Sequence, residues 1–437
     1  MMVTSFFNNI KNNNNVLLFL LFKCVVACNM VMLFFPTNVI CHKNPVVVVP
    51  GLGGSVLEAK LENRPPGRDC QQNSDWYTIW ASVVQGAFRY DCFRDNLQLY
   101  LNSSTLTGLS NYTGVHIRPR DFGGTGGIEY SNAGTGEPPI AYMHSLVKTM
   151  EDKAGYVSGI SIRAATNDFR IVGLDASLDF EYSRLQWLIE DTYKLNNGSK
   201  VHLLSHSLGG PLTNLFLTTY VSSTWKSQYI ASHIMLSAPL LGSPVSIYAA
   251  LSGPRYDYVP QFLPALVTPL VRTFVSIVWM WPRRDENGVN PWGDDTIFVQ
   301  TPSRNYTLSS LKNLSKDIPG ASILSNKWDE VEDRTRYSTA DPGVKVLCMY
   351  ANDTKTDLSI ATVDAFDKKG TTLRSTWGDG TVSLLSLNAC SGWSDVEVRP
   401  IQFGGTLAAH TEIVQSKIVI AKILDWLVGF EGGEDDG

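Results

Sequence analysis

The sequence predicts an α/β fold with a mainly parallel sheet, because strand-like and helix-like segments alternate along it. Two short apolar runs, Pro45–Gly54 and Phe169–Asp175, contain or are bounded by glycine and have the pattern of buried strands. The segment Ser183–Tyr193, which follows the second run, carries apolar residues at helical spacing. The length of 437 residues suits one large domain of this class with insertions.

Residues 1–41 are the first element and are predicted to be a signal peptide or signal anchor. Lys23 separates the apolar run 16–22 from a second apolar run. Lys23 and Asn29 would each cost roughly 2–3 kcal/mol at the centre of a bilayer, which favours a cleavable signal over a retained anchor. The rest of the chain is then expected in the secretory pathway: outside the cell, in a vacuole- or lysosome-type lumen, or anchored to an endomembrane.

Cysteines and sequons agree with export. Four cysteines lie beyond the signal, and sequence proximity favours two disulfides among the possible pairings, Cys70–Cys92 and Cys348–Cys390. Each closed loop would contribute about 3–4 kcal/mol in the chain-entropy model, whereas reduced, buried thiols are the alternative. Asn-x-Ser/Thr sequons, which glycosylation would hold at the surface, start at Asn102, Asn111, Asn197, Asn305 and Asn352.

The segment Val201–Gly210 carries the most specific local signal. A short apolar strand runs into Ser205-x-Ser207-x-Gly209 and then into a helix. Small residues on both sides of Ser207 allow a tight strand-to-helix turn that lifts its oxygen above a sheet, and the helix dipole favours an oxyanion there. A small-x-Ser-x-Gly string alone is common, but this context predicts a nucleophile elbow with Ser207 as the nucleophile.

A serine nucleophile needs a general base and a carboxylate, which in hydrolases with this elbow follow in the order Ser, acid, His. His410 fits the base, because it lies in a small-residue loop before a terminal amphipathic run, whereas His233 enters a predicted strand and suits a structural role. Asp379 fits the acid, because it lies between two glycines after an apolar run; the alternative is an ordinary turn aspartate. Its rivals lie before the serine or inside the last helix: Asp168, Asp175 and Asp425.

Backbone N–H groups are needed where negative charge develops on a substrate. Leu208 supplies one because it follows the nucleophile, and Leu52 is expected to supply the other. Glycines around Leu52 permit the close approach of a ligand, with a purely structural glycine turn as the alternative.

Seven segments spread over most of the chain carry a further signal. They are Val49–Lys60, Asp91–Leu97, Gly114–Gly123, Ser205–Gly210, Ser237–Gly242, Gly378–Val382 and Ala409–Glu412. Through these segments the chain resembles the lecithin:cholesterol acyltransferase and lysosomal phospholipase A family, and particularly its plant lecithin:cholesterol acyltransferase-like members.

This resemblance implies an α/β-hydrolase core with a membrane-binding subdomain and cap or lid insertions. It implies a triad on Ser207, Asp379 and His410, the same three residues that the patterns above select. The implied boundaries are 42–437 for the hydrolase domain, about 62–100 for its membrane-binding loop, about 243–330 for its cap or lid, and Ser243–Tyr258 for the lid itself.

The resemblance also bears on lipid contact. It implies that Cys70–Cys92 closes a loop that touches lipid near the active site, so Trp76 and Trp80 would insert at the membrane interface. Ordinary core packing of the two tryptophans is the alternative.

Two departures from the family pattern affect the substrate. Leu52 stands where members often carry Asp or Asn, so only its backbone N–H can serve an oxyanion. Ala165–Asp168 stands where many members read Pro-Tyr-Asp, which predicts an altered acyl or head-group pocket.

The predicted function is ping-pong acyl transfer from a glycerophospholipid through an acyl-Ser207 intermediate. Water as acceptor gives a phospholipase A, and a sterol or another lipophilic alcohol gives an O-acyltransferase. The expected partner is a phospholipid membrane or lipid particle; the chain is expected to be a monomer without cofactor or metal, and its net charge of -5 argues against nucleic acid. The alternatives are a soluble non-phospholipid esterase or thioesterase with the same triad, and a lipid-binding protein with an inactive triad.

Overall fold

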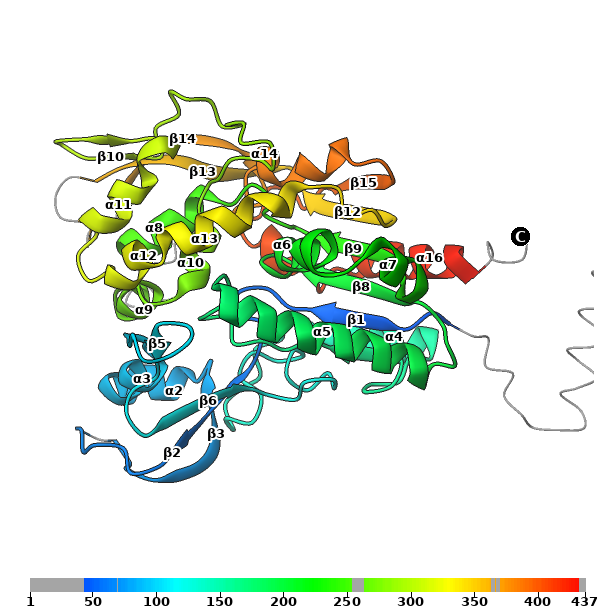
Figure 1. The fold of residues 1–437 in the computed structure, drawn as a ribbon, viewed down its shortest axis with the longest axis horizontal. Helices are drawn as coiled ribbons and strands as arrows, with labels where there is room; N and C mark the ends of the chain where they lie inside the picture. The colour runs from blue at the N-terminus through cyan, green and yellow to red at the C-terminus, as the bar shows by residue number, and fades with distance from the viewer. Residues whose placement is uncertain (1–42, 69, 254–262, 363–365, 367–369, 432–437) are drawn as a thin grey trace, which may run out of the picture. The chain divides into compact units, whose positions relative to one another are not determined.

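The computed structural model of the chain describes residues 43–431 except 69, 254–262, 363–365 and 367–369 (Figure 1). The signal segment predicted at 1–41 lies outside the described residues. Within the described ranges, no helix is long and apolar enough to cross a membrane. The first strand begins at Val46, shortly after the predicted signal segment.

A six-stranded sheet forms the centre of the described domain, and all its neighbouring strands are parallel. Its order is β15-β12-β9-β8-β1-β7, so the first strand lies between strands that come much later in the chain. The strands are β1 (Val46–Val49), β7 (Ile162–Ala164), β8 (Val201–His206), β9 (Ile230–Leu236), β12 (Val346–Ala351) and β15 (Val396–Ile401). The predicted α/β fold with a mainly parallel sheet is confirmed.

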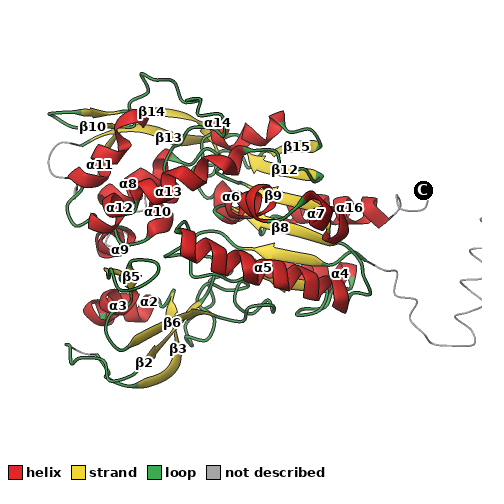
Figure 2. Ribbon diagram, viewed as in Figure 1, coloured by secondary structure: helices red, strands yellow, loops and turns green. Residues whose placement is uncertain are grey.

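Helices cover both faces of this sheet (Figure 2). Alternate valines of β1 point to opposite faces, as the period of a strand requires. One pair packs into a hydrophobic cluster with α5 and α6, and the other pair packs with α4 and α16. The four helices are α4 (His144–Ala154), α5 (Asp175–Leu195), α6 (Gly209–Leu215) and α16 (Lys417–Glu431). Burial on both faces explains why β1 is an uninterrupted apolar run.

The run Phe169–Asp175 is not a strand, contrary to the prediction from its sequence. It forms turns that lead into α5, and the strand of this region is the shorter β7. The Asp168 carboxylate accepts hydrogen bonds from the Arg170 backbone N–H at 3.2 Å and from the Arg170 guanidinium at 2.9 and 2.7 Å. Local bonding of this kind competes with strand pairing, so these apolar residues pack as a buried turn.

A three-stranded antiparallel sheet, β3-β2-β6, belongs to a second region that we call the N-terminal lobe, residues 57–120. Figure 1 shows the lobe below the central sheet. Its elements are β2 (Leu57–Leu61), β3 (Ser74–Trp80), α2 (Val83–Phe88), α3 (Tyr90–Leu97), β4 (Tyr100–Leu101), β5 (Leu109–Ser110) and β6 (Val115–Pro119). The loop predicted to bind membranes, about 62–100, falls inside it.

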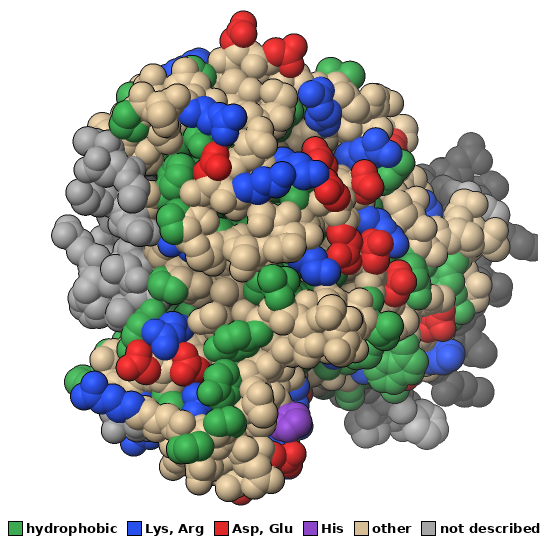
Figure 3. All heavy atoms as spheres, turned by 60° about the vertical axis from the view of Figure 1, so that its left-hand side comes forward, with side chains coloured by type: hydrophobic (Ala, Val, Ile, Leu, Met, Phe, Trp, Pro, Cys, Tyr) green, Lys and Arg blue, Asp and Glu red, His purple; other side chains and the backbone are tan. Residues whose placement is uncertain are grey.

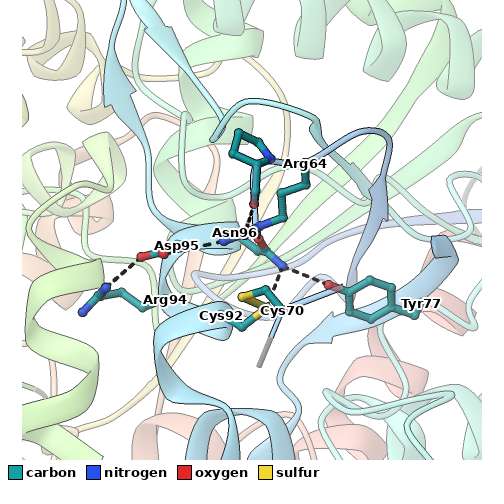
Figure 4. Close-up of a disulfide and its surroundings, with 8 residues drawn as sticks. Arg64, Cys70, Tyr77, Cys92, Arg94, Asp95 and Asn96 are labelled. Atoms are coloured by element: carbon teal, nitrogen blue, oxygen red, sulfur yellow. Dashed lines mark hydrogen bonds and ion pairs between the residues drawn. A yellow bond between two sulfur atoms is a disulfide. The ribbon is translucent and has the colours of Figure 1, made fainter. Parts of the chain in front are cut away.

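Both predicted disulfides are present. Cys70–Cys92 ties the loop between β2 and β3 to α3 in the N-terminal lobe, with the two Cα atoms 5.3 Å apart (Figure 4). Cys348–Cys390 joins β12 to the 3₁₀ turn η4 (Asn388–Gly392), with its Cα atoms 6.7 Å apart. One disulfide therefore supports each of the two regions.

The segment predicted as a cap, 243–330, is mostly helical. A small sheet, β11-β10-β13-β14, joins two of its strands to two strands that come later. Residues 254–258 of the predicted lid lie outside the described residues. The elements are α8 (Pro244–Ser252), α9 (Leu263–Val271), α10 (Val275–Trp279), β10 (Val299–Gln300), β11 (Asn305–Tyr306), α11 (Leu311–Asp317), α12 (Ser322–Asn326), α13 (Trp328–Thr335), β13 (Thr354–Ala361) and β14 (Thr371–Gly378).

Candidate active site

Ser207 lies at the turn between β8 and α6. Its φ is +52°, in the left-handed region that costs a non-glycine residue roughly 1–2 kcal/mol. The surroundings are tight: a Cβ on Gly209 would lie 2.3 Å from the Val49 carbonyl oxygen, and one on Gly51 would lie 2.8 Å from Ser207 Cβ. Glycine is therefore required at both positions, and the turn has the strained form of a nucleophile elbow.

The structure brings Ser207, His410 and Asp379 together. His410 Nε2 lies 2.9 Å from Ser207 Oγ, and His410 Nδ1 lies 2.7 Å from Asp379 Oδ2. The His410 backbone N–H also donates to the Asp379 carbonyl oxygen at 3.1 Å, which fixes the two segments to each other. With Nδ1–H donating to the carboxylate, Nε2 presents its lone pair to the serine hydroxyl, as a general base requires.

Asp379 is fully buried in the turn after β14, and His410 lies in the short helix α15 (Ala409–Glu412). The second carboxylate oxygen, Oδ1, accepts the backbone N–H groups of Thr381 at 3.0 Å and Val382 at 2.7 Å. These donors compensate the burial of the negative charge and leave Oδ2 for the imidazole. The carboxylate is thus held in one orientation.

One of the two predicted oxyanion donors, Leu208, adjoins the serine in the chain, and the other, Leu52, lines the cavity beside it. Leu208 follows Ser207 at the start of α6, where helix N–H groups have no partner inside the helix. Leu52 lies in a turn closed by a hydrogen bond of 3.0 Å from the Gly54 N–H to the Gly51 carbonyl oxygen. Leu52 lines the same cavity as Ser207 and His410. The role of the two backbone N–H groups as oxyanion donors stays a prediction.

A cavity of about 220 Å³ opens beside Ser207 and His410. Apolar side chains of α8 and of the end of α10 line it together with hydroxyl groups, two of which come from α8 or its N-cap. Apolar lining residues are Val245, Ala249, Ile277 and Met280, and polar ones are Ser131, Ser243, Ser246 and Thr381. Such a cavity suits an apolar chain joined to a polar ester.

Burial keeps three histidines around the elbow neutral. It lowers the pKa of His202, His206 and His233 to about 3. His233 lies within β9, and its Nε2 atom lies 2.8 Å from Ser205 Oγ rather than at the nucleophile. This is the structural position that the sequence indicated for His233.

Sequence reasoning missed two side chains beside the triad, Tyr142 and His206. The Tyr142 hydroxyl lies 2.7 Å from His206 Nδ1 and accepts the Gly51 N–H at 3.0 Å. No local pattern marks Tyr142, which comes well before the elbow in the sequence. The adjacency of His206 to Ser207 was a signal that could have found it.

The two tryptophans predicted to insert into membranes lie in different settings. Trp80 is half-buried, donates from Nε1 to the Gly53 carbonyl oxygen at 2.9 Å and packs on Phe169 with ring centres 5.4 Å apart. Trp76 is 37% exposed, with the Arg118 guanidinium 4.0 Å from its ring centre. Trp76 is thus open to an approaching surface, whereas Trp80 contacts the loop that carries Leu52.

Three exposed apolar side chains of the lobe lie on α2, and sequence reasoning missed them. Leu106, between β4 and β5, is also exposed, at 96%. Val83, Val84 and Phe88 are 47%, 51% and 81% exposed. Figure 3 shows hydrophobic side chains scattered over the lower part of the molecule, where the lobe lies. These three side chains leave apolar surface open to solvent on α2.

The predicted glycosylation sequons all lie outside the buried core. Asn197 and Asn305 are exposed, and the other three, Asn102, Asn111 and Asn352, are half-buried. A further sequon starts at Asn313, which is exposed on α11 and was overlooked in the sequence. A glycan is sterically compatible with the exposed positions.

Comparisons with known proteins agree with the geometry. A family model described as "Lecithin:cholesterol acyltransferase" matches residues 76–345. "Lecithin-cholesterol acyltransferase-like 1" of Arabidopsis thaliana is 31% identical over 400 residues, 87% of this chain and 88% of that protein. The human "Lysosomal phospholipase A and acyltransferase" is 29% identical over 88% of this chain and 90% of its own length. The human "Phosphatidylcholine-sterol acyltransferase" is 31% identical over 82% and 79%.

Proposed function

The chain belongs to the lecithin:cholesterol acyltransferase family, and on that premise we propose that it transfers a fatty acyl group from a glycerophospholipid through an acyl-Ser207 intermediate. The observation that carries this proposal is the hydrogen-bonded row Ser207–His410–Asp379 at the edge of a partly apolar cavity. Relatives named for acyltransferase and for phospholipase A activity support the same chemistry.

In the first half-reaction, Ser207 Oγ attacks the ester carbonyl carbon of the phospholipid while His410 Nε2 takes its proton. The carbonyl oxygen becomes an oxyanion, for which the backbone N–H groups of Leu52 and Leu208 are the proposed donors. The ester bond to glycerol then breaks, and the lysophospholipid leaves as an alcohol with the proton that His410 returns. The acyl group remains as an ester on Ser207.

In the second half-reaction, an acceptor hydroxyl gives its proton to His410 and attacks the acyl-Ser207 carbonyl. A sterol or another lipophilic alcohol yields a new ester, and water yields a free fatty acid. Ser207 leaves with the proton from His410, so the enzyme returns to its starting state. Asp379 supports both halves because it holds the imidazole in one tautomer and stabilises the imidazolium that forms twice.

The N-terminal lobe is the part that we propose contacts a phospholipid membrane or lipid particle. The exposed Trp76 and the apolar side chains of α2 support this role, and the half-buried Trp80 is included in the proposal because it joins the same strand to the Leu52 loop. We further propose a monomer in the secretory pathway, outside the cell or in a vacuole- or lysosome-type lumen. The domain bounds 42–437, with a membrane-binding loop about 62–100 and a cap about 243–330, belong to the same proposal.

Product analysis tests the function. Liposomes of acyl-labelled phosphatidylcholine are incubated with the wild type, Ser207→Ala and the surface control Ser303→Ala, with and without a sterol or a long-chain alcohol. We expect the wild type and Ser303→Ala to release labelled fatty acid or form labelled ester, and Ser207→Ala to do neither. Label in ester only when alcohol is present identifies an acyltransferase, and fatty acid under all conditions identifies a phospholipase A.

Two outcomes would contradict the proposal. Turnover of a water-soluble ester without any turnover of liposomes would identify the soluble esterase alternative. No reaction of Ser207 with a serine-directed fluorophosphonate would identify a protein with an inactive triad.

A further inference from the structure

A row of buried polar groups runs beside the proposed triad and has no part in the mechanism above. It begins at the Gly51 N–H, which donates to Tyr142 Oη at 3.0 Å. Tyr142 Oη lies 2.7 Å from His206 Nδ1, and His206 Nε2 lies 2.9 Å from the carbonyl oxygen of His410. Tyr142, His206 and His410 are all buried, so these contacts are shielded from water.

The direction of every hydrogen bond in this row is determined. The His410 carbonyl oxygen can only accept, so His206 Nε2 carries a hydrogen and donates. Burial and the neighbouring His410 lower the pKa of His206 to about 3, so the ring is neutral and Nδ1 has a lone pair. Burial raises the pKa of Tyr142, so its hydroxyl keeps the proton and donates it to Nδ1. The hydroxyl oxygen then accepts the Gly51 N–H, so the donor and the acceptor of all three hydrogen bonds are defined.

One end of the row fixes the loop of the oxyanion donor. Gly51 immediately precedes Leu52, and the turn that holds Leu52 closes at Gly54. A Cβ on Gly54 would lie 2.6 Å from the Tyr142 ring, so the ring packs directly on the backbone of this turn. Tyr142 therefore holds the turn on both sides of Leu52, by a hydrogen bond before it and by ring contact after it.

The other end fixes the base. His206 adjoins Ser207 in the chain and donates to the backbone carbonyl of His410, whose N–H in turn donates to Asp379. The row thus connects two parts of the site that come from opposite ends of the sequence. Acyl transfer requires these parts to be held within about 0.5 Å of the productive geometry.

We propose that Tyr142 and His206 are positioning residues. They hold the turn Gly51–Gly54, which carries the predicted oxyanion donor, at a fixed position relative to the triad base His410. This inference rests on the proposed function and names residues that set its efficiency. Both residues line part of the cavity beside Ser207, but the hydrogen bonds that carry the proposal run to the Gly51 N–H and to the His410 carbonyl oxygen. Removal of one hydroxyl would leave two buried polar groups unpaired, at the Gly51 N–H and at His206 Nδ1.

The decisive variant is Tyr142→Phe, which removes the hydroxyl and keeps the ring against Gly54. Its matched control is Tyr156→Phe, because Tyr156 is also buried and donates to a backbone carbonyl, that of Asn44, at 3.1 Å. Rates on a water-soluble p-nitrophenyl ester are divided by the number of sites that react with a fluorophosphonate, so unfolded enzyme does not count. We expect kcat per site to fall about tenfold or more in Tyr142→Phe, with KM within about twofold. The control should stay within about twofold in both.

Two further measurements separate positioning from mere stability. A trifluoromethyl ketone, which forms a tetrahedral oxyanion on the serine, should lose affinity for Tyr142→Phe by the same factor as kcat/KM. His206→Gln should retain more of kcat per site than His206→Leu, because an amide can donate to the His410 carbonyl and accept from Tyr142 while leucine can do neither.

The proposal is overturned if Tyr142→Phe keeps wild-type kcat per site, if Tyr156→Phe loses as much, or if ketone affinity is unchanged while kcat falls. It is also overturned if His206→Gln and His206→Leu are equally impaired. Failure of the proposed function would look different: the wild type would not turn over phosphatidylcholine liposomes, while the variants would still differ on the soluble ester.

Discussion

The central sheet and the N-terminal lobe differ in where they place their apolar side chains. Each valine of β1 is at most 1% exposed, and these residues lie beneath the elbow of Ser207. On α2 of the lobe, Phe88 is 81% exposed and Val84 is 51% exposed. Rigid, dry packing suits a site that must hold reacting groups in place, while exposed apolar side chains suit contact with lipid.

The two regions also differ in what stabilises them. The sheet has a large hydrophobic core on both faces. Buried apolar residues of the lobe, among them Leu57 and Ile79, share the hydrophobic cluster on one face of the sheet. The lobe adds polar contacts around Arg64, which is buried, donates to Asn96 Oδ1 at 2.8 Å and lies 3.5 Å from the Asp95 carboxylate (Figure 4). Perturbation of the two regions should therefore have separable effects.

The largest effect is expected in the sheet region, from Asp379→Asn. The amide would favour the wrong imidazole tautomer, so kcat should fall by roughly 10⁴-fold on both liposomes and a water-soluble ester. Initial rates on the two substrates measure this. A loss confined to liposomes would contradict the assignment of Asp379 to the triad.

Removal of the disulfides is the next largest change and compares the regions directly. Cys70→Ser with Cys92→Ser, and Cys348→Ser with Cys390→Ser, should each lower the free energy of unfolding by about 2–4 kcal/mol. We expect the first pair to lose liposome activity while activity on the soluble ester survives, and the second pair to lose both together. Unfolding in denaturant measures the loss of stability, and the liposome and soluble-ester assays measure the two activities. Equal loss of both activities in the two double variants would contradict a separate role for the lobe.

Acid should weaken the sheet through its buried histidines. Burial lowers the pKa of His233 from 6.5, its value in an unfolded chain, to about 3 in the folded protein. Between these two pH values the unfolded chain therefore binds more protons than the folded protein. The stability that neutral His233 contributes is complete above pH 6.5 and is lost as pH falls, by about 1.4 kcal/mol per pH unit. Glu181 works in the opposite direction, because burial raises its pKa to about 7.

The measurement for this prediction is thermal melting from pH 7 to 4 on the wild type and His233→Gln. The melting temperature of the wild type should fall more steeply with acid than that of the variant. Parallel curves would show that His233 does not contribute.

The smallest effect is expected from the surface of the lobe. Val84→Ser with Phe88→Ser should lower turnover of liposomes about tenfold, because each side chain loses part of the 1.5–3 kcal/mol that full burial in lipid would give, or about 1.4 kcal/mol in total. Turnover of the soluble ester should not change. Ile418→Ser is the control, since Ile418 is 63% exposed on α16, outside the lobe. Vesicle co-sedimentation and the two activity assays measure this. If Ile418→Ser loses as much liposome binding and turnover as the double variant, lipid contact through α2 is contradicted.

The central sheet and the N-terminal lobe also differ in how much of their structure could be predicted from the sequence. The strand-to-helix turn at Ser207 could be predicted because the strained geometry restricts which residues can stand next to it, and the glycines around Asp379 marked its turn. The exposure of Trp80 could not be predicted, because an aromatic residue in a strand fits either face. The six residues of α2 are too few to show a helical period. Tyr142 comes from a distant part of the chain, and Phe169–Asp175 was misassigned because a side-chain contact of Asp168 outweighed the strand pattern.

The parallel sheet has a consequence for how the enzyme matures. Ser207 and His410 are separated by 203 positions in the sequence. β1 pairs only with β7 and β8, so it has no neighbour in the sheet until those strands have been synthesised. Contacts of such long range form late and make folding slow. A growing chain that has not yet produced His410 has a serine without a base. Acyl transfer therefore requires synthesis to pass the last strand of the sheet, β15, and to reach His410.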